Sequence, residues 1–180
     1  MAELITSLPL VDALCDQYCE PLGRHHTAYR HHIYRVINFV QYLQPDMTDE
    51  DMLKLQIAGF FHDAGIWLAG TFDYLQPSVR LAGHYLEENF NGQWHDDISA
   101  LILNHHKITS FKGSLVLVEN FRKADWIDVT LGIRRFGLNI STIREVQQRF
   151  PNAGFHALLV RLGCKHMLTH PLRPLPMMRR

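Results

Sequence analysis

The chain has 180 residues, of which 47% are hydrophobic and 20% are charged, the composition of an ordinary globular domain. A single domain of this length can bury a substantial core, because a domain of about 150 residues hides roughly 70% of the surface that its unfolded chain exposes. Lys plus Arg and Asp plus Glu both number 18, so the formal net charge is zero. This balance argues against a large nucleic acid or an anionic membrane as partner, since both favour a strongly positive protein.

Neither membrane insertion nor a disulfide framework is expected. The N-terminus lacks a charged region ahead of an apolar stretch, and no segment approaches the roughly 18 apolar residues of a membrane span. The three cysteines, Cys15, Cys19 and Cys164, are too few and too unevenly placed for a disulfide scaffold. Cys15 and Cys19 lack the spacing of a zinc ribbon and are expected to be packing residues. These features predict a soluble, cytoplasmic protein.

Histidine is the unusual feature of the composition. The chain has 12 histidines, where average usage gives about four. They are dispersed along the chain, which excludes a purification tag. Imidazole is the commonest metal ligand in proteins and the usual proton carrier near neutral pH. The excess therefore indicates a metal or catalytic site.

Hydrophobic residues recur at intervals of three and four along the whole chain, without strand patterns of comparable length. The pattern predicts an all-α protein and one domain over residues 1–180. Thr48 and Asp51 form a variant of the capping box, and Asn91-Gly92 is a typical helix end. The expected helices cover about 10–20, part of 23–43, 48–65, 78–90, 95–107, 114–129, 140–149 and 153–168. Residues 170–180 are rich in proline and are expected to be irregular.

Several polar residues fall on or beside the apolar faces of these helices. An adjacent imidazole and carboxylate, His62 and Asp63, follow an apolar run, and burying both is costly unless a partner such as a metal ion binds them. His31 stands beside His32 on its helix and is an alternative to it, since a small error of helix phase exchanges the two. The inward-facing candidates are His32, His62, Asp63, His84, His105, His106 and Asp125. The remaining histidines, expected at the surface or in packing, are His25, His26, His95, His156, His166 and His170.

The order of these residues resembles the HD-domain superfamily of metal-dependent phosphohydrolases, whose signature is a histidine, a His-Asp doublet and a distant aspartate. The matching pieces are HHIYRV with His32, FFHDAG with His62 and Asp63, and KADWID with Asp125. The resemblance covers about residues 25–130. It implies an HD-domain helical bundle in which these four residues bind metal, with further helices over about 139–170.

Members of the superfamily with two metals add histidines between the doublet and the last aspartate. His84, His105 and His106 stand where those additions are expected, so the resemblance favours two metals bridged by Asp63. ITSFKG replaces the GYP tripeptide of the cyclic-dinucleotide phosphodiesterases, so that class is not implied. Imidazoles with carboxylates suit one or two ions of Fe, Mn, Co, Ni or Zn, with Mg also possible.

The leading expectation is hydrolysis of a nucleotide or another small phosphate ester by metal-activated water, with Asp63 as the central catalytic ligand. Arg35, one turn from His32, and Lys107, directly after the double histidine, are expected to contact the phosphate. Arg80, Arg122 and Lys123 are weaker candidates for this contact. Two alternatives stay open: a di-iron oxygenase with the same ligands, and a non-catalytic module that binds metal and a nucleotide. The oligomeric state is not predicted.

Overall fold

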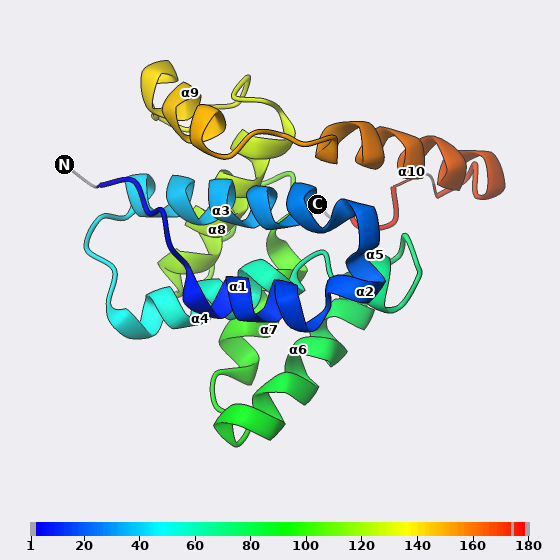
Figure 1. Ribbon diagram of the computed structural model, residues 1–180, viewed down its shortest axis with the longest axis horizontal. Helices are drawn as coiled ribbons and strands as arrows, with labels where there is room; N and C mark the ends of the chain where they lie inside the picture. The colour runs from blue at the N-terminus through cyan, green and yellow to red at the C-terminus, as the bar shows by residue number, and fades with distance from the viewer. Residues whose placement is uncertain (1–2, 174, 179–180) are drawn as a thin grey trace.

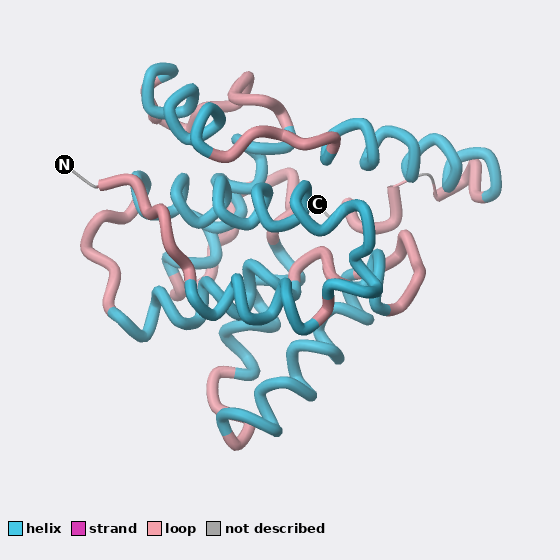
Figure 2. The backbone as a smooth tube through the Cα atoms, in the orientation of Figure 1, coloured by secondary structure: helices cyan, strands magenta, loops and turns pink. Residues whose placement is uncertain are grey.

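The computed structural model describes residues 3–173 and 175–178, and within them every regular element is a helix (Figures 1 and 2). The predicted all-α class is confirmed. The elements are α1 (Pro9–Gln17), α2 (Cys19–Leu22), the 3₁₀ helix η1 (Gly23–His25), α3 (His26–Leu43), α4 (Asp49–Phe61), α5 (Gly65–Leu68), α6 (Leu75–Phe90), α7 (His95–Asn104), α8 (Val116–Val129), α9 (Ile140–Arg149) and α10 (Phe155–Thr169).

Helix α3 lies at the centre of the bundle, with α1 and α4 below it and α9 and α10 above it in Figure 1. Helix α8 packs along α3, and α7 packs between α4 and α8. Every residue from His32 to Val40 is buried, so α3 is covered on all sides over more than two turns. A polar side chain in this part of α3 must therefore find its partners inside the protein.

Helix α4 begins with the predicted capping box, but it is shorter than predicted. The Thr48 hydroxyl accepts from the backbone N–H of Asp51, and the Asp51 carboxylate accepts from the N–H of Thr48, which completes the capping box. The helix ends at Phe61 rather than near Gly65, so His62 is its C-cap and Asp63 lies in the following turn. A Cβ on Gly59 would lie 3.1 Å from Ile33 Cγ2. This close approach of α3 and α4 brings His32 and His62 together.

One early boundary differs from the sequence prediction. Pro21 was expected to end the first helix, but it lies within α2, and the break falls at Tyr18. Proline is tolerated there because the first N–H groups of a helix have no partner within it. The next long helix, predicted over part of 23–43, is α3 and begins at His26.

The later boundaries follow the prediction more closely. Helix α6 begins at Leu75, three residues early, with Pro77 in its first turn, where proline is accepted. It ends at Asn91, which adopts a left-handed conformation (φ 51°) ahead of Gly92, as predicted. Helix α7 ends at Asn104, so His105 and His106 lie at its C-terminus and not within it.

The C-terminal part is only loosely covered. Phe155 and Leu158 are the buried residues of α10, and the rest of the helix is partly or fully exposed. The described residues after α10 are irregular, as predicted, yet Met177 is buried in a small cluster with Tyr74 and Leu75 of α6. The other residues of this stretch, Pro174, Arg179 and Arg180, lie outside the described residues. No described helix has both the length and the apolar character that crossing a membrane requires.

Candidate metal centre

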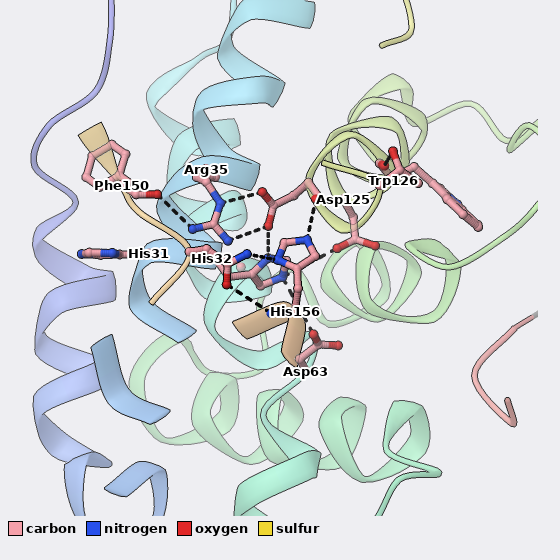
Figure 3. A network of polar contacts seen from close by, with 12 residues as sticks. His31, His32, Arg35, Asp63, Asp125, Trp126, Phe150 and His156 are labelled. Atoms are coloured by element: carbon pink, nitrogen blue, oxygen red, sulfur yellow. Dashed lines mark hydrogen bonds and ion pairs between the residues drawn. The ribbon is translucent and has the colours of Figure 1, made fainter. Parts of the chain in front are cut away.

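Imidazoles and carboxylates from four helices meet at one point in the interior, and Figure 3 shows three of them, His32, Asp63 and Asp125. Five of the six residues are buried, and the sixth, His106, is partly buried. They occupy α3, the end of α4, the end of α7 and the middle of α8. The converging side chains are those of His32, His62, Asp63, His105, His106 and Asp125.

The tightest contact of the cluster joins two imidazoles. Nε2 of His32 lies 2.9 Å from Nε2 of His62. Oδ2 of Asp63 lies 3.5 Å from His62 Nε2 and 3.8 Å from His32 Nε2. Oδ1 of Asp125 completes this side of the cluster, 3.7 Å from His32 Nε2. Two nitrogens and two carboxylate oxygens thus surround one small volume.

The outer nitrogens of three histidines fix how the rings are protonated. Nδ1 of His62 donates to the carbonyl of Gly59 at 2.7 Å, and Nδ1 of His105 donates to that of Ile102 at 2.6 Å. Nδ1 of His32 lies 2.7 Å from a carboxylate oxygen of Asp128. Carbonyl and carboxylate oxygens accept hydrogen bonds, so the proton of each neutral ring is on Nδ1. Each Nε2 therefore presents a lone pair to the cluster.

The histidines at the end of α7 extend the cluster on its other side. Nε2 of His105 lies 3.4 Å from Oδ1 of Asp63, and Nδ1 of His106 lies 3.3 Å from Oδ2 of Asp125. Nε2 of His106 is hydrogen-bonded to the hydroxyl of Tyr74 at 2.6 Å. Asp63 and Asp125 thus each face histidines with both carboxylate oxygens.

Buried atoms without hydrogen-bond partners show that this donor set fits a metal ion. They are Oδ1 of Asp63, both carboxylate oxygens of Asp125 and Nε2 of His105. The two lone pairs of His32 and His62 at 2.9 Å repel each other unless a cation lies beside both. Neighbouring ligands in an octahedral shell with bonds of about 2.1 Å lie about 3 Å apart, which matches this spacing.

The protonation states also suit metal binding. Burial lowers the pKa of His62 to about 4, so its ring is neutral near pH 7. Burial acting alone would raise the pKa of Asp63, but the imidazoles of His62 and His105 hold it well below its usual range. The pKa of Asp125 is likewise lowered against burial, by His106, whose own pKa the carboxylate raises. Both carboxylates are thus ionised, the form that binds a metal.

A comparison with protein families agrees with this geometry. The family model described as HD domain matches residues 29–130, more than half of the chain, and spans every residue of the cluster. The chain belongs to the HD domain family. Members of this family are largely metal-dependent hydrolases. No curated protein and no solved structure matches the chain.

The HD domain also contains a buried aspartate that the sequence analysis missed. Asp128 lies one turn after Asp125 on α8, and it accepts from His32 and forms a double ion pair with Arg35 at 2.6 and 2.9 Å. The imidazole and the guanidinium together hold the pKa of Asp128 far below its usual range, against the effect of burial. A carboxylate behind a metal-binding histidine orients the ring and raises its basicity. The spacing of DWID, with two acids one turn apart, was the available signal.

Arg35 needs a correction. It was expected to contact a substrate phosphate, but its guanidinium is buried, and it donates to Asp128 and to the carbonyls of Phe150 and Pro151. With these donors engaged, Arg35 holds Asp128 and the segment before α10 in place. His31, the alternative to His32, points away from the cluster and contacts the carbonyl of Pro151 (Figure 3).

His84 needs the second correction, because it lies outside the cluster. Its side chain is 76% exposed and contacts Glu88 at 3.3 Å. The buried face of α6 is formed by Leu75, Ser78, Ala82 and Leu86. His84 is two residues from both Ala82 and Leu86, which places it about 200° round the helix, on the opposite face.

The other basic candidates line a surface hollow, form ion pairs or are exposed. Lys107 lines a surface hollow of about 620 Å³ together with Asn104 and residues 109–113, and its role in phosphate binding stays a prediction. Arg122 forms a buried ion pair with Glu119, and Lys123 lies 3.8 Å from the same carboxylate. Arg80 is exposed on α6.

The segment outside the family match also contacts the metal centre. The ring of Phe155 stacks on His32, with centroids 4.1 Å apart and planes at 16°. Nε2 of His156 donates to the backbone carbonyl of Asp128 at 2.9 Å. His156 was expected to be a surface or packing residue, and it supports the aspartate that holds His32. Long-range packing of this kind has no local sequence signal.

Proposed function

We propose that this HD domain is a metal-dependent phosphohydrolase that hydrolyses a nucleotide or another small phosphate ester. The observation that carries the proposal is the set of buried, unpaired ligand atoms on Asp63, His105 and Asp125, beside the facing lone pairs of His32 and His62. Membership of a family composed largely of metal-dependent hydrolases supports the same chemistry.

Each residue of the cluster has a definite part in this proposal. His32, His62, Asp63 and Asp125 hold a divalent transition ion, and Asp63 also faces His105. When bound, the metal lowers the pKa of a water molecule from about 16 toward 7 and so supplies a nucleophile at neutral pH. Asp128 keeps the proton of His32 on Nδ1, so that Nε2 stays available as a ligand.

His106 marks the side from which a substrate approaches. Its side chain is 13% exposed, whereas the side chains of the other five residues are at most 3% exposed. Its ring lies between Asp125 and the hydroxyl of Tyr74, and its pKa is raised. With one ion bound, and His106 not among its ligands, a histidinium in that position would donate a proton to a departing oxygen. So enclosed a centre suits a small phosphorylated molecule better than a polymer.

The way in which the ligands are shared bears on whether the proposed site holds one ion or two. Three groups of ligands each lie close enough to hold an ion: His32 with His62 and Asp125, His62 with Asp63 and His105, and His105 with His106 and Asp125. They share members, so the cluster supports one ion well and a second through His105 and His106. His84 takes no part in either site.

The test compares wild type with Asp63→Asn, His105→Ala and His84→Ala. Metal content is measured by mass spectrometry, and hydrolysis of a panel of nucleotides and phosphomonoesters is measured with Mn, Fe, Co, Ni, Zn and Mg. We expect Asp63→Asn to lose activity by at least about a thousandfold while its circular dichroism is unchanged. His105→Ala should lose metal, and His84→Ala, a matched histidine at the surface, should keep both metal and activity. Full activity in Asp63→Asn would refute the proposal.

A second candidate function is dioxygen chemistry at a di-iron centre. The overlapping ligand groups around His105 and His106 favour it, because they leave room for two ions. Predominant iron in the purified protein, with oxygen uptake and no phosphate release, would select the oxygenase. Inactivity with every metal and substrate would select the non-catalytic module.

A further inference from the structure

A second cavity lies beside the metal centre, between the start of α3 and the start of α10. It has a volume of about 320 Å³. Its lining combines three basic side chains with small residues that leave the backbone accessible. The lining residues are Arg24, His25, Ala153, Gly154, Ala157, Leu158 and Arg161. None of these lining residues is acidic, and none of their side chains has a place in the proposed reaction.

Two arginines from distant parts of the chain meet at this cavity. Arg24 is in η1 and Arg161 is in α10. Both are close enough to His25 that their charges add to burial in lowering its pKa. In the described part of the chain neither arginine forms an ion pair with a carboxylate, whereas Arg30, Arg35 and Arg122 each do. Two like charges at one cavity favour an anion between them.

The hydrogen bonds of His25 also favour an anion in this cavity. The indole N–H of Trp67 donates to Nδ1 of His25 at 3.2 Å. Nε–H of Arg24 points at the other ring nitrogen, Nε2, at 3.3 Å. A neutral imidazole has only one acceptor nitrogen, so it can accept from only one of these two donors. The other donor is left without an acceptor at His25, and an oxyanion in the cavity would supply one.

The backbone around the cavity suits an anion as well. Gly154, with φ 91°, is the N-cap of the 15-residue helix α10. Asn152 accepts from the N–H groups of Phe155 and His156, so the helix start contributes its dipole more than free N–H groups. Ala153, Gly154 and Ala157 allow a ligand close to the first turn, where the helix dipole is positive. This feature adds to the arginines and His25 and does not carry the inference by itself.

Aromatic residues next to the cavity lining also contact the metal ligands. Phe155, next to Gly154, stacks on the ligand His32. Trp67, which donates to His25, packs on Tyr29 with ring centroids 4.4 Å apart. The Tyr29 ring in turn faces His32 and His62, with centroid distances of 6.4 and 6.2 Å. Aromatic contacts thus connect the residues of the cavity with the metal ligands.

We propose that this cavity binds the phosphate group of a small molecule, held by the guanidinium groups of Arg24 and Arg161 beside the ring of His25. A phosphate accepts hydrogen bonds on several oxygens, which matches donors that approach from two sides. The phosphate comes from one of two sources: a second phosphate of the substrate itself, or a separate effector molecule. Only this assignment of the source rests on the proposed function.

The binding test uses inorganic phosphate as the probe, measured by titration calorimetry on the full chain. The Asp63→Asn background is used so that phosphate at the metal centre does not dominate the signal. Addition of Arg24→Gln and Arg161→Gln should weaken binding by at least about tenfold, because two charge-assisted contacts are lost. The matched control adds Arg135→Gln and Arg144→Gln, which remove the same charge at exposed positions elsewhere, and should bind as the background does.

Two results would overturn the proposal. One is the absence of measurable phosphate binding to the Asp63→Asn protein. The other is equal binding by the Arg24/Arg161 and Arg135/Arg144 variants. Thermal melting of each variant verifies its fold, and both arginine pairs are exposed, so we expect unchanged melting temperatures. Because this arm needs no turnover, its outcome is independent of whether the protein hydrolyses phosphate esters.

The source is assigned with the metal-loaded protein that keeps Asp63. If the phosphate belongs to the substrate, Arg24→Gln/Arg161→Gln raises KM for a substrate with two separate phosphates and leaves KM for a monophosphate unchanged. If it belongs to an effector, added inorganic phosphate changes monophosphate hydrolysis in wild type beyond simple competition, and the double variant loses that change. Either pattern supports a phosphate site at the cavity.

Discussion

Residues 29–130 and the segment that follows them contribute to the metal centre in different ways. The first region supplies all six clustered side chains, and the outer nitrogens of His62 and His105 are bonded to the backbone of their own helices. The second region is largely exposed, yet Phe155 covers His32 and His156 supports Asp128. The ligands thus lie within the family match, whereas part of the enclosure of the centre comes from the chain outside it.

The difference extends to the exposed side of the site. Tyr74, which bonds His106, packs against Met177 near the C-terminus. The C-terminal segment therefore contacts the ligands through Phe155 and reaches the neighbour of His106 through Met177. From this comparison, we expect changes in the first region to remove metal or unfold the protein. Changes in the second region should alter the stability of the protein and the access of solutes to the metal centre more than they alter the set of ligands.

The largest effect is expected at Asp128, where the two regions meet. Asp128→Ala leaves the buried guanidinium of Arg35 without its partner and should cost about 3–5 kcal/mol in the free energy of unfolding, measured by urea denaturation. The isosteric Asp128→Asn should keep the fold and weaken metal binding by about 10–100-fold, because His32 loses its carboxylate. Glu119→Gln, which breaks another ion pair of α8, is the control and should retain metal affinity. Equal metal affinity in Asp128→Asn and wild type would contradict the role given to this residue.

The next largest effect is expected at Phe155. Phe155→Ala removes a fully buried ring from α10 and should cost about 3 kcal/mol, because the cavity lies against His32 and cannot close without moving it. Thermal and urea unfolding measure the loss, and metal content measures its effect on the site. Val160→Ala on the same helix is the control, since Val160 is 66% exposed and its loss should change stability by less than about 0.5 kcal/mol. Similar effects of the two changes would show that α10 is not anchored on His32.

A smaller effect is expected at Gly65, just after the His-Asp turn. A Cβ there would lie 2.8 Å from the carbonyl of Tyr74 and 3.1 Å from Oγ of Ser78, so Gly65→Ala should destabilise the protein by about 1–3 kcal/mol. Gly163→Ala in α10 is the matched control: its Cβ would meet Phe72 at 3.9 Å, and alanine favours the helix. It should therefore leave stability unchanged or raise it by up to about 1 kcal/mol. A loss of stability in Gly163→Ala as large as that in Gly65→Ala would contradict the tight packing assigned to Gly65.

The smallest effect on stability is expected at Met177. Met177→Ala removes one side chain from a small cluster and should cost about 1 kcal/mol, less than a residue of the main core. Because the cluster contains Tyr74, we expect a chelator to remove metal faster from this variant than from wild type, measured by stopped-flow absorbance. Leu172→Ala, at a fully exposed residue, is the control and should not change the rate. An unchanged rate in Met177→Ala would show that the C-terminal segment does not limit access.

The sequence by itself determined the helices, the capping box at Thr48 and the order of the clustered residues. These depend on local periodicity and on short-range hydrogen bonds, which act within a few residues of the chain. Periodicity also indicated the helical stripe near which His105 and Asp125 fall. Periodicity placed His84 on the wrong face of α6, because the sequence does not show which helices pack against that face.

Only the tertiary structure decided what the polar residues contact. Asp128 lies 96 positions from His32 in the chain, and Arg35 reaches carbonyls more than 110 positions away. No local pattern encodes such pairs, because they depend on where α8 and the segment before α10 pack against α3. The same holds for the cavity of Arg24 and Arg161, which exists only once the two ends of the chain are folded together. Local sequence thus specified the ligands, and packing specified their partners.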